Sequence, residues 1–350
     1  MGEQNDIPSK ADGAPRRARR NTGAMTLRQV AQLAEVAPVT VSRVLNTPLV
    51  VSPEVRERVL AVIRDTGYVP NRLAGGLASA RSNLIAAIVP TISMSVFLQT
   101  VQSLTDSLFH ADYQLMLGQT GYSAEREDAL LEAIIGRRPD GIVLTGIMHS
   151  PEGRRLLQAS GIPVVETWDF TPNPIDMLVG LSHEQLGAAV CKHLHTKGRR
   201  RLGLLSGDDE RAARRRKGFY AEAGRLGLRE PALQLEKSPT SHTEGRAGLA
   251  ALLAAQPDID AVFCSSDMLA LGVLTEAQAR AMAVPDQLAV VGFGDIEFAQ
   301  TVIPSLTTVR IDGTRMGQTA AGFIADRAEG KTVAEPVVDI GFSIMERESA

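Results

Sequence analysis

The sequence predicts an α/β protein with a small helical domain ahead of a larger core built on parallel sheets. A helix–turn–helix pattern runs from Thr26 to Asn46, and a third helix follows it. From Leu84 onward, short apolar strands alternate with helical stretches in two successive runs. Continuous apolar strands between helices are typical of parallel sheets covered on both faces, so two runs predict two subdomains. A chain of 350 residues, 44% of them hydrophobic, is long enough to bury such a core.

The first helix of the N-terminal pattern begins after Thr26. Thr26 is a good N-cap residue, and Gln29 three residues later can complete a capping box. One face of this helix would carry the apolar residues Leu27, Val30, Ala31 and Ala34. Residues 35–37 are too few for anything but a turn. Pro38 suits the first position of a second helix, where its missing N–H costs nothing.

The second helix, residues 38–46, has a polar outer face. Its inward positions are Val41, Val44 and Leu45. Its outward positions are Pro38, Val39, Thr40, Ser42, Arg43 and Asn46. Arg43 can form two hydrogen bonds with a guanine, whereas Thr40, Ser42 and Asn46 can bond phosphate oxygens. The pattern therefore fits a DNA-reading helix, although a plain helical hairpin within a core has the same pattern.

A third helix favours the DNA-reading interpretation. Ser52 is placed to cap it, Pro53 takes its first position and Gly67 ends it. Its expected inward residues are Val55, Val59, Val62 and Ile63. Three helices form the smallest unit that buries both faces of the turn.

Three short runs carry a resemblance to a known family. The runs are Thr-Val-Ser-Arg-Val-Leu-Asn at 40–46, Val-Ser-Pro-Glu at 51–54 and Gly-Tyr-Val-Pro-Asn-Arg-Leu-Ala at 67–74. Together they resemble the DNA-binding head of the lactose-repressor (LacI) family, here expected over residues 25–70. The resemblance implies that Pro38, Val39 and Arg43 take the base-reading positions. Pro38 and Val39 offer no side-chain hydrogen bond, so directional readout falls on Arg43.

The turn of the predicted head departs from the family pattern at two positions. Glu35 stands where the family usually has glycine, and Ala37 stands where it usually has a capping Ser or Thr. A missing side-chain cap costs about 1 kcal/mol of helix stability.

Charge is distributed unevenly along the chain. Residues 1–81 hold twelve Lys and Arg against seven Asp and Glu, whereas the whole chain has a net charge of −3. A basic head on an acidic body is expected of a DNA-binding module joined to another domain. Residues 1–24 lack periodicity and are expected to be a disordered basic tail, which either attracts phosphates or has no role.

Residues 71–82 resemble the family's hinge, a segment that becomes helical on operator DNA. Leu77 takes the position of the leucine that wedges into the minor groove. Gly75-Gly76 would weaken a helix here. The alternative to a hinge helix is a plain flexible linker. With the hinge included, the predicted DNA contacts are Thr26, Leu27, Pro38, Val39, Thr40, Ser42, Arg43, Asn46, Ala74 and Leu77.

Several classes of protein are disfavoured by absent motifs. The sequence has no Walker-type phosphate loop, no Gly-x-Ser-x-Gly elbow and no metal-spaced His/Cys set, so we expect neither an enzyme nor a cofactor or metal. Cys191 and Cys264 fit two buried free thiols. No apolar run approaches a membrane span and no signal-peptide core is present, which predicts a cytoplasmic protein without membrane contact.

The core, residues 83–350, resembles that of the LacI family and of periplasmic sugar-binding proteins. Its landmarks are residues 265–272, 291–295 and 304–309. The strands that we expect lie at 84–89, 114–117, 141–144, 163–165, 176–181, 201–205, 261–264 and 288–291. The resemblance implies three crossings between subdomains, placed near Leu181, Val309 and Glu335. The N-subdomain would comprise about 83–181 and 310–335, and the C-subdomain about 182–309 and 336–350.

The resemblance also places an effector in the cleft between the subdomains. The predicted effector-binding positions are Phe97, Trp168, Asp169, Arg215, Ser266 and Gly294. The family has Asn and Asp where Ser266 and Gly294 stand. Because one potential carboxylate is absent, this cleft repels an anionic ligand less strongly. Of the basic run 211–217, we expect only Arg215 to face inward and the rest to form a solvated helix face. Asp267 is expected to cap its helix.

The segments 165–169, 175–180 and 339–342 look most like the gluconate-utilisation repressors within the family. This resemblance implies a repressor that a sugar acid such as gluconate releases from double-stranded operator DNA. Ligand acting as a co-repressor is an alternative, and a sugar-binding protein without a DNA role is another. We expect a homodimer, because the sequence ends without the leucine-heptad tail that would build a tetramer.

Overall fold

The computed structural model describes residues 25–70, 81–92, 95–147 and 150–350. The chain divides into two compact units, residues 1–80 and 81–350, and each is described by itself. The expected disordered tail, residues 1–24, lies outside the described residues. So does most of the predicted hinge, including Ala74 and Leu77.

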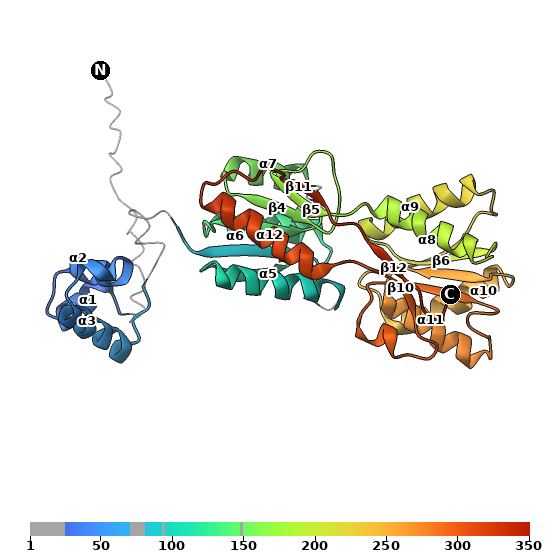
Figure 1. The fold of residues 1–350 in the computed structure, drawn as a ribbon, viewed down its shortest axis with the longest axis horizontal. Coiled ribbons are helices and arrows are strands. Elements are labelled where there is room, and N and C mark those ends of the chain that lie inside the picture. The colour runs from blue at the N-terminus through green and yellow to red at the C-terminus, as the bar shows by residue number, and fades with distance from the viewer. Residues whose placement is uncertain (1–24, 71–80, 93–94, 148–149) are drawn as a thin grey trace, which may run out of the picture. The chain divides into compact units, whose positions relative to one another are not determined.

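The first unit contains the predicted three-helix head (Figure 1). Its elements are α1 (Leu27–Leu33), α2 (Pro38–Asn46), a short 3-10 turn η1 (Pro48–Val50) and α3 (Pro53–Thr66). The buried side chains at its centre are Val30, Ala31, Ala34, Val41, Val44, Val59 and Tyr68. The inward faces predicted for all three helices therefore meet in one apolar cluster, with Leu45 and Ile63 packed at its margin.

Local sequence explains most of the ends of these helices. Thr26 and Gln29 form the predicted capping box, and Gly67 ends α3 with a φ of 62°. Ser52 occupies the N-cap position of α3, but its side chain makes no capping hydrogen bond, so that expectation was wrong. Glu35 adopts a φ of 53°, the left-handed region in which glycine is favoured. Ala37 leaves α2 without a side-chain cap.

The first subdomain of the core is a six-stranded parallel sheet in the order β11-β5-β4-β3-β1-β2. Its strands are β1 (Leu84–Val89), β2 (Gln114–Gln119), β3 (Gly141–Thr145), β4 (Val164–Thr167), β5 (Met177–Gly180) and β11 (Val337–Asp339). Its helical elements are η2 (Ser95–Phe97), α5 (Leu98–His110), α6 (Ala124–Ile135), α7 (Pro151–Ser160) and α12 (Gly313–Ala328). Helices α5 and α12 pack against each other along one side of the sheet (Figure 1).

The second subdomain repeats this architecture in the order β12-β10-β9-β8-β6-β7, with only β12 antiparallel to its neighbour. Its strands are β6 (Leu202–Gly207), β7 (Ala232–Glu236), β8 (Ala261–Cys264), β9 (Ala289–Phe293), β10 (Thr307–Arg310) and β12 (Ser343–Met345). Its helical elements are α8 (His183–Thr196), α9 (Glu210–Arg225), α10 (His242–Ala255), α11 (Asp267–Ala279) and η3 (Glu297–Gln300). The predicted parallel α/β core is thus confirmed.

The chain crosses between the subdomains at residues 181–182, 311–312 and 340–342. The third crossing lies beyond the position near Glu335 that the sequence suggested. The reason is β11, which continues the first sheet by pairing with β5, Val338 opposite Val179, before the chain leaves it. Such a three-residue strand carries too little apolar pattern to be recognised in the sequence. None of the helices in the described ranges is long and apolar enough to cross a membrane.

The uncapped start of α2 gives a first prediction. Ala37→Ser should stabilise the head by about 1 kcal/mol, because a hydroxyl at this N-cap can accept the backbone N–H of Thr40. The backbone at Ala37, with φ −69° and ψ 147°, already has the required conformation. Amide hydrogen exchange of α2 in the full-length protein measures the effect. Ala37→Val is the matched control, and equal exchange rates in the two variants would contradict the prediction.

Candidate functional site

The outer face of α2 carries the side chains that the sequence assigned to DNA reading. Pro38, Val39, Arg43 and Asn46 are exposed, while Thr40 and Ser42 are half-buried. The amide of Asn46 donates to the backbone oxygen of Ser42 at 3.0 Å and to its hydroxyl at 3.3 Å. Asn46 is thereby tied to its own helix, which leaves Arg43 as the long polar side chain that extends from this face.

Thr26 and Leu27 have structural roles in the head. The Thr26 hydroxyl accepts the Gln29 N–H at 3.3 Å, and Leu27 is half-buried beside the central cluster. Thr26 caps α1 and remains exposed at the surface of the head.

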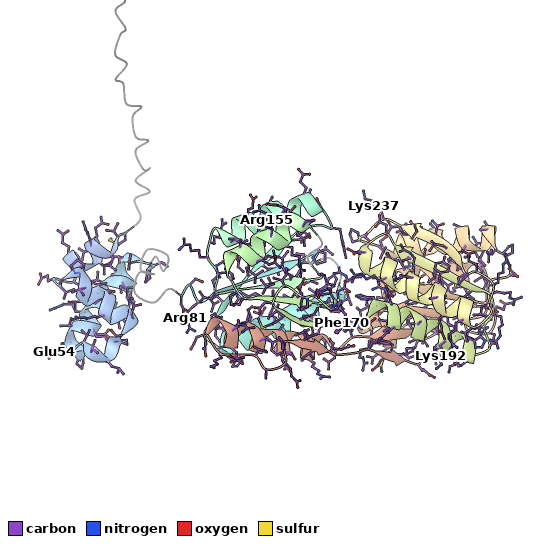
Figure 2. All side chains as sticks on the ribbon, turned by 90° about the horizontal axis from the view of Figure 1, so that it is seen from above. Glu54, Arg81, Arg155, Phe170, Lys192 and Lys237 are labelled. Atoms are coloured by element: carbon purple, nitrogen blue, oxygen red, sulfur yellow. The ribbon has the colours of Figure 1, made fainter. Side chains whose placement is uncertain are left out.

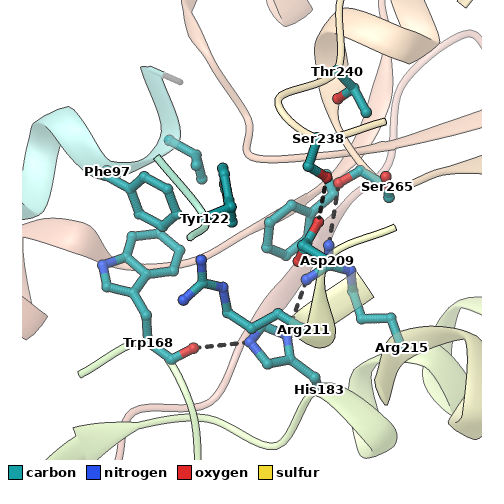
Figure 3. Close-up of a pocket in the computed structure, with 12 residues that line it drawn as sticks. Phe97, Tyr122, Trp168, His183, Asp209, Arg211, Arg215, Ser238, Thr240 and Ser265 are labelled. Carbon is teal, nitrogen blue, oxygen red and sulfur yellow. Dashed lines mark hydrogen bonds between the residues drawn. The ribbon is translucent and has the colours of Figure 1, made fainter. Parts of the chain in front are cut away.

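Side chains from the two subdomains of the core line a small cavity between them (Figure 3). Three of the six predicted effector positions, Phe97, Trp168 and Arg215, line it. The other lining residues are Val96, Tyr122, His183, Asp209, Arg211, Ser238, Thr240, Ser265 and Phe293. Both subdomains contribute side chains, as expected for a ligand bound at the carboxyl ends of two sheets.

The first subdomain supplies an aromatic wall. The rings of Phe97 and Trp168 meet edge to face with their centroids 5.1 Å apart. The indole N–H of Trp168 donates to the Thr100 hydroxyl at 3.1 Å, which fixes the ring. Gly180 on β5 makes room for the loop after Trp168, since a Cβ there would lie 1.7 Å from the Asp169 carbonyl oxygen.

Two glycines allow α8 and α9 to pack closely enough to build the opposite wall. A Cβ on Gly187 would lie 1.9 Å from the carbonyl oxygen of Arg215, and one on Gly218 would lie 1.9 Å from that of Glu184. This close approach places His183 of α8 beside Arg215 of α9, with Nδ1 and Nη1 3.1 Å apart (Figure 3). Larger residues at either glycine would push the two helices apart.

Arg215 is a buried cation held mainly by neutral groups. Its Nη2 donates to the Ser265 carbonyl oxygen at 3.4 Å, and its guanidinium lies 4.2 Å from the centre of the Phe293 ring. Within the described part of the chain, its Nε has no hydrogen-bond partner. Burial lowers the pKa of Arg215 to about 10, so it stays protonated at neutral pH.

His183 is neutral in this arrangement. Burial, reinforced by the positive charge of Arg215, holds its pKa well below its usual range. The ring therefore carries one proton, on Nε2, which donates to the Trp168 carbonyl oxygen at 2.8 Å. Nδ1 is then free to accept from Arg215. His183 thus links Arg215 in one subdomain to the Trp168 loop in the other.

Asp209 supplies the carboxylate of the cavity. It caps α9 by accepting the Ala212 N–H at 3.1 Å, and it accepts the Ser238 hydroxyl at 3.1 Å. Burial opposes its ionisation, but Arg215 and, to a smaller extent, Arg211 outweigh this and lower its pKa. Asp209 is therefore ionised at neutral pH.

Arg211, which the sequence assigned to a solvated helix face, lines the cavity instead. Its Nη1 donates to the Thr145 carbonyl oxygen at 3.1 Å, and its guanidinium lies 5.2 Å from the centre of the Phe97 ring. The solvated interpretation was also wrong for Arg214 and Arg216. Arg214 pairs with Asp169 at 2.7 Å, and Arg216 donates to the Gly207 carbonyl oxygen at 2.7 Å.

Helical spacing could have identified these arginines. Residues 211, 214 and 215 follow one another at i, i+3 and i+4, so they share one face of α9. Lys217 does lie on the exposed side, as expected, where it pairs with Glu184 at 2.7 Å. His183 and Tyr122 left no such signal, because each enters the cavity from a loop or a helix start.

The remaining predicted effector positions lie outside the cavity lining. Asp169 is buried and paired with Arg214 in the groove that adjoins the cavity, close to Phe170 at the junction of the lobes (Figure 2). Ser266 caps α11 by accepting the Leu269 N–H at 3.2 Å. Gly294 lines a separate groove beside Arg310.

Asp267 has a different role from the one expected. The N-cap of α11 is Ser266, and Asp267 is the next residue. Its carboxyl group accepts the Thr308 hydroxyl at 2.5 Å and the Ile296 N–H at 2.9 Å. It therefore joins α11 to β10 and to the loop after β9.

Comparison with known proteins agrees with this architecture. Residues 26–71 match the bacterial regulatory proteins of the lacI family, and residues 191–350 match a periplasmic binding protein-like domain. The HTH-type transcriptional regulator GntR of Pseudomonas aeruginosa is 35% identical over 332 residues, which cover 94% of this chain and 97% of that protein. The chain belongs to the LacI family.

Solved structures of LacI-family proteins share its fold. A LacI-family transcriptional regulator from Silicibacter pomeroyi is 33% identical, with a TM-score of 0.88 over 93% of this chain and 99% of that one. The lac repressor dimer bound to operator and an anti-inducer has a TM-score of 0.79 at 23% identity, over 93% of this chain and 99% of that one. The protein is a DNA-binding transcriptional regulator of the LacI family, and its relatives are regulators rather than enzymes.

The buried ion pair between the subdomains yields a second prediction. Asp169→Asn should lower the free energy of unfolding of the core by about 2 kcal/mol, because Arg214 loses its buried counter-charge. Glu184→Gln removes the same charge from the exposed pair with Lys217 and should change stability by less than about 0.5 kcal/mol. Urea unfolding followed by Trp168 fluorescence compares the two variants. Equal effects would contradict a structural role for the buried pair.

Proposed function

We propose that this regulator represses genes of sugar-acid catabolism and leaves its operator when a sugar acid such as gluconate fills the cleft. The observation that carries the proposal is the buried Arg215, whose Nε has no partner among the described residues and which lines the cavity together with Arg211. Two guanidinium groups are the side chains best suited to bind a carboxylate.

The rest of the cavity suits a short polyol chain. Asp209, Ser238 and Thr240 provide oxygen atoms for hydroxyl groups on one side. Phe97 and Trp168 provide an apolar wall on the other side. Polar groups on one wall and apolar rings on the other are the arrangement expected of a small-molecule site.

Likeness to other proteins supports the same ligand class. The relative from Pseudomonas aeruginosa is a GntR regulator, and the IdnR regulator of Escherichia coli is also related, at 29% identity over 91% of this chain. The segments 165–169 and 339–342 resemble gluconate-utilisation repressors. The first of them includes Trp168, which lines the cavity.

Closure of the cleft would carry the signal. Contacts from the second subdomain to the first include the hydrogen bonds from Arg211 to the Thr145 carbonyl, from Arg214 to Asp169, and from His183 to the Trp168 carbonyl. A ligand held between the same walls would favour one relative position of the subdomains. Its binding and operator binding would then be reciprocally coupled, typically by about 1–3 kcal/mol.

The proposed DNA-binding form is a homodimer that places two heads on a pseudo-palindromic site. Edge strand β7 exposes Leu233 and Leu235, an apolar pair that fits burial against a second subunit. Arg43 would read a guanine, with Pro38 and Val39 touching sugar or a thymine methyl group. Ala74 and Leu77 keep their proposed minor-groove role, although they lie outside the described residues.

The test uses fluorescence anisotropy of labelled DNA from the region upstream of the gene. Added D-gluconate should release the full-length protein, and the same titration should change Trp168 fluorescence saturably. Arg43→Ala should weaken operator binding by about 1–3 kcal/mol and relax discrimination at one base pair. Arg58→Ala, which removes an exposed arginine from α3 instead, is the matched control and should keep that discrimination.

Each outcome has a distinct meaning. If gluconate changes neither operator binding nor Trp168 fluorescence while Arg43 behaves as expected, the sugar-acid assignment is wrong. If gluconate tightens operator binding, the ligand is a co-repressor.

A further inference from the structure

We propose that Thr100 of α5 is a positioning residue of the cleft, which holds the Trp168 ring and passes the position of that ring to the packed helices α5 and α12. The inference rests on the proposed function, because it specifies how a ligand in the cleft acts on the first subdomain. It assigns a role to a buried hydroxyl group that lies behind the cavity lining.

Trp168 is held at both of its polar ends. Its carbonyl oxygen accepts the Nε2 proton of His183 at 2.8 Å (Figure 3), and its indole N–H donates to the Thr100 hydroxyl at 3.1 Å. Its backbone has a φ of 63°, which is unfavourable for a bulky residue and persists only where neighbours hold it. The side chain is 2% exposed, so it has little freedom to rearrange. A change at one end of Trp168 therefore affects the contact at the other end.

The start of α5 meets Trp168 at two points one helical turn apart. Phe97, the N-cap residue of α5, packs its ring edge to face on the indole. Thr100, three residues later, accepts the indole N–H and is itself 4% exposed. An indole nitrogen can only donate, so loss of the hydroxyl would leave this N–H buried without that acceptor. The position of the Trp168 ring is thereby tied to the first turn of α5.

Thr100 also lies at the contact between α5 and α12 (Figure 1). A Cβ on Gly313 would lie 3.0 Å from the Thr100 hydroxyl oxygen, and one on Gly317 would lie 2.6 Å from the Thr100 carbonyl oxygen. The Ser103 hydroxyl donates to the Thr314 carbonyl oxygen at 2.9 Å. Helix α12 begins directly after the second crossing between the subdomains. A displacement of Thr100 would therefore reach the helix that follows this crossing.

Consecutive hydrogen bonds connect the cavity to this contact. Arg215 donates to His183 at 3.1 Å, and His183 donates to the Trp168 carbonyl oxygen. Arg215 can only donate and a carbonyl oxygen can only accept, so these two partners fix the single proton of His183 on Nε2. A ligand carboxylate that draws the Arg215 guanidinium toward itself would weaken the first of these bonds. The effect would then reach Thr100 through Trp168.

The first experiment compares Thr100→Val with Thr105→Val in the full-length protein. Thr105 is an exposed residue of the same helix, and its hydroxyl donates to the Val101 carbonyl oxygen. Fluorescence anisotropy measures the factor by which saturating D-gluconate changes operator affinity, typically about 5- to 150-fold for such coupling. Thr100→Val should make this factor at least about fivefold smaller, and Thr105→Val should leave it unchanged. Thr100→Ser, which keeps the hydroxyl, should restore it.

Trp168→Phe tests the same hydrogen bond from its other end, because it removes the indole N–H and keeps an aromatic ring. This variant should also reduce the factor. The double variant Thr100→Val/Trp168→Phe should lose no more coupling than the more affected single variant, as expected when both substitutions remove one contact.

Two further measurements need no ligand. Trp168 is the only tryptophan in the sequence, so its indole N–H gives a single NMR resonance. This resonance should shift in Thr100→Val, because the N–H loses its acceptor, and should stay in place in Thr105→Val. Amide hydrogen exchange at residues 313–317, the first turn of α12, should become faster in Thr100→Val and stay unchanged in Thr105→Val.

Thermal melting of each variant confirms that the core is folded. An undiminished gluconate effect in Thr100→Val or in Trp168→Phe would overturn the inference and leave the proposed function intact. An equal loss in Thr105→Val, no recovery in Thr100→Ser, or additive losses in the double variant would do the same. If gluconate does not change operator binding by the wild-type protein, the proposed function is wrong. The resonance and exchange measurements then decide the role of Thr100, and unchanged values in Thr100→Val would reject it.

Discussion

The burial of one positive charge, that of Arg215, constrains the whole cleft. A guanidinium can be buried there only because α8 and α9 approach closely at Gly187 and Gly218, which brings His183 within hydrogen-bond distance. Burial, reinforced by this charge, keeps His183 neutral, and the remaining proton of His183 holds the Trp168 loop. This buried cation therefore contributes to the protonation of His183 and of Asp209 in the cleft.

This arrangement explains how ligand chemistry can become domain movement. Helix α9 belongs to the second subdomain, yet two of its arginines contact the first, Arg211 at the Thr145 carbonyl and Arg214 at Asp169. A charged ligand between these walls would act on the contacts that Arg211 and Arg214 already make with the first subdomain. Since the chain crosses between the lobes three times, a change in the cleft can alter their relative position without unfolding either lobe.

The sequence predicted the helices of the head and eight of the core strands, because their apolar periodicity and capping residues are local signals. A family resemblance also selected Phe97, Trp168 and Arg215, which line the cavity. Of the strands in the described residues, the sequence did not predict β7, β10, β11 or β12. The last two are three-residue strands stabilised by pairing with distant partners. The sequence also missed Arg211, because a basic run looks solvated until the Phe97 ring and Thr145 carbonyl are known to face it. Such contacts join residues far apart in the chain, and no local pattern encodes them.

The most direct test of this account is the melting temperature of Arg215→Met with and without gluconate. Methionine has a similar length and no charge. Removing one member of a buried charge pair is destabilising, because Asp209 loses its main counter-charge. The account predicts that the variant melts lower than the wild type without ligand and shows no gluconate-induced shift. A variant that melts as high as the wild type, or that is still stabilised by gluconate, would contradict it.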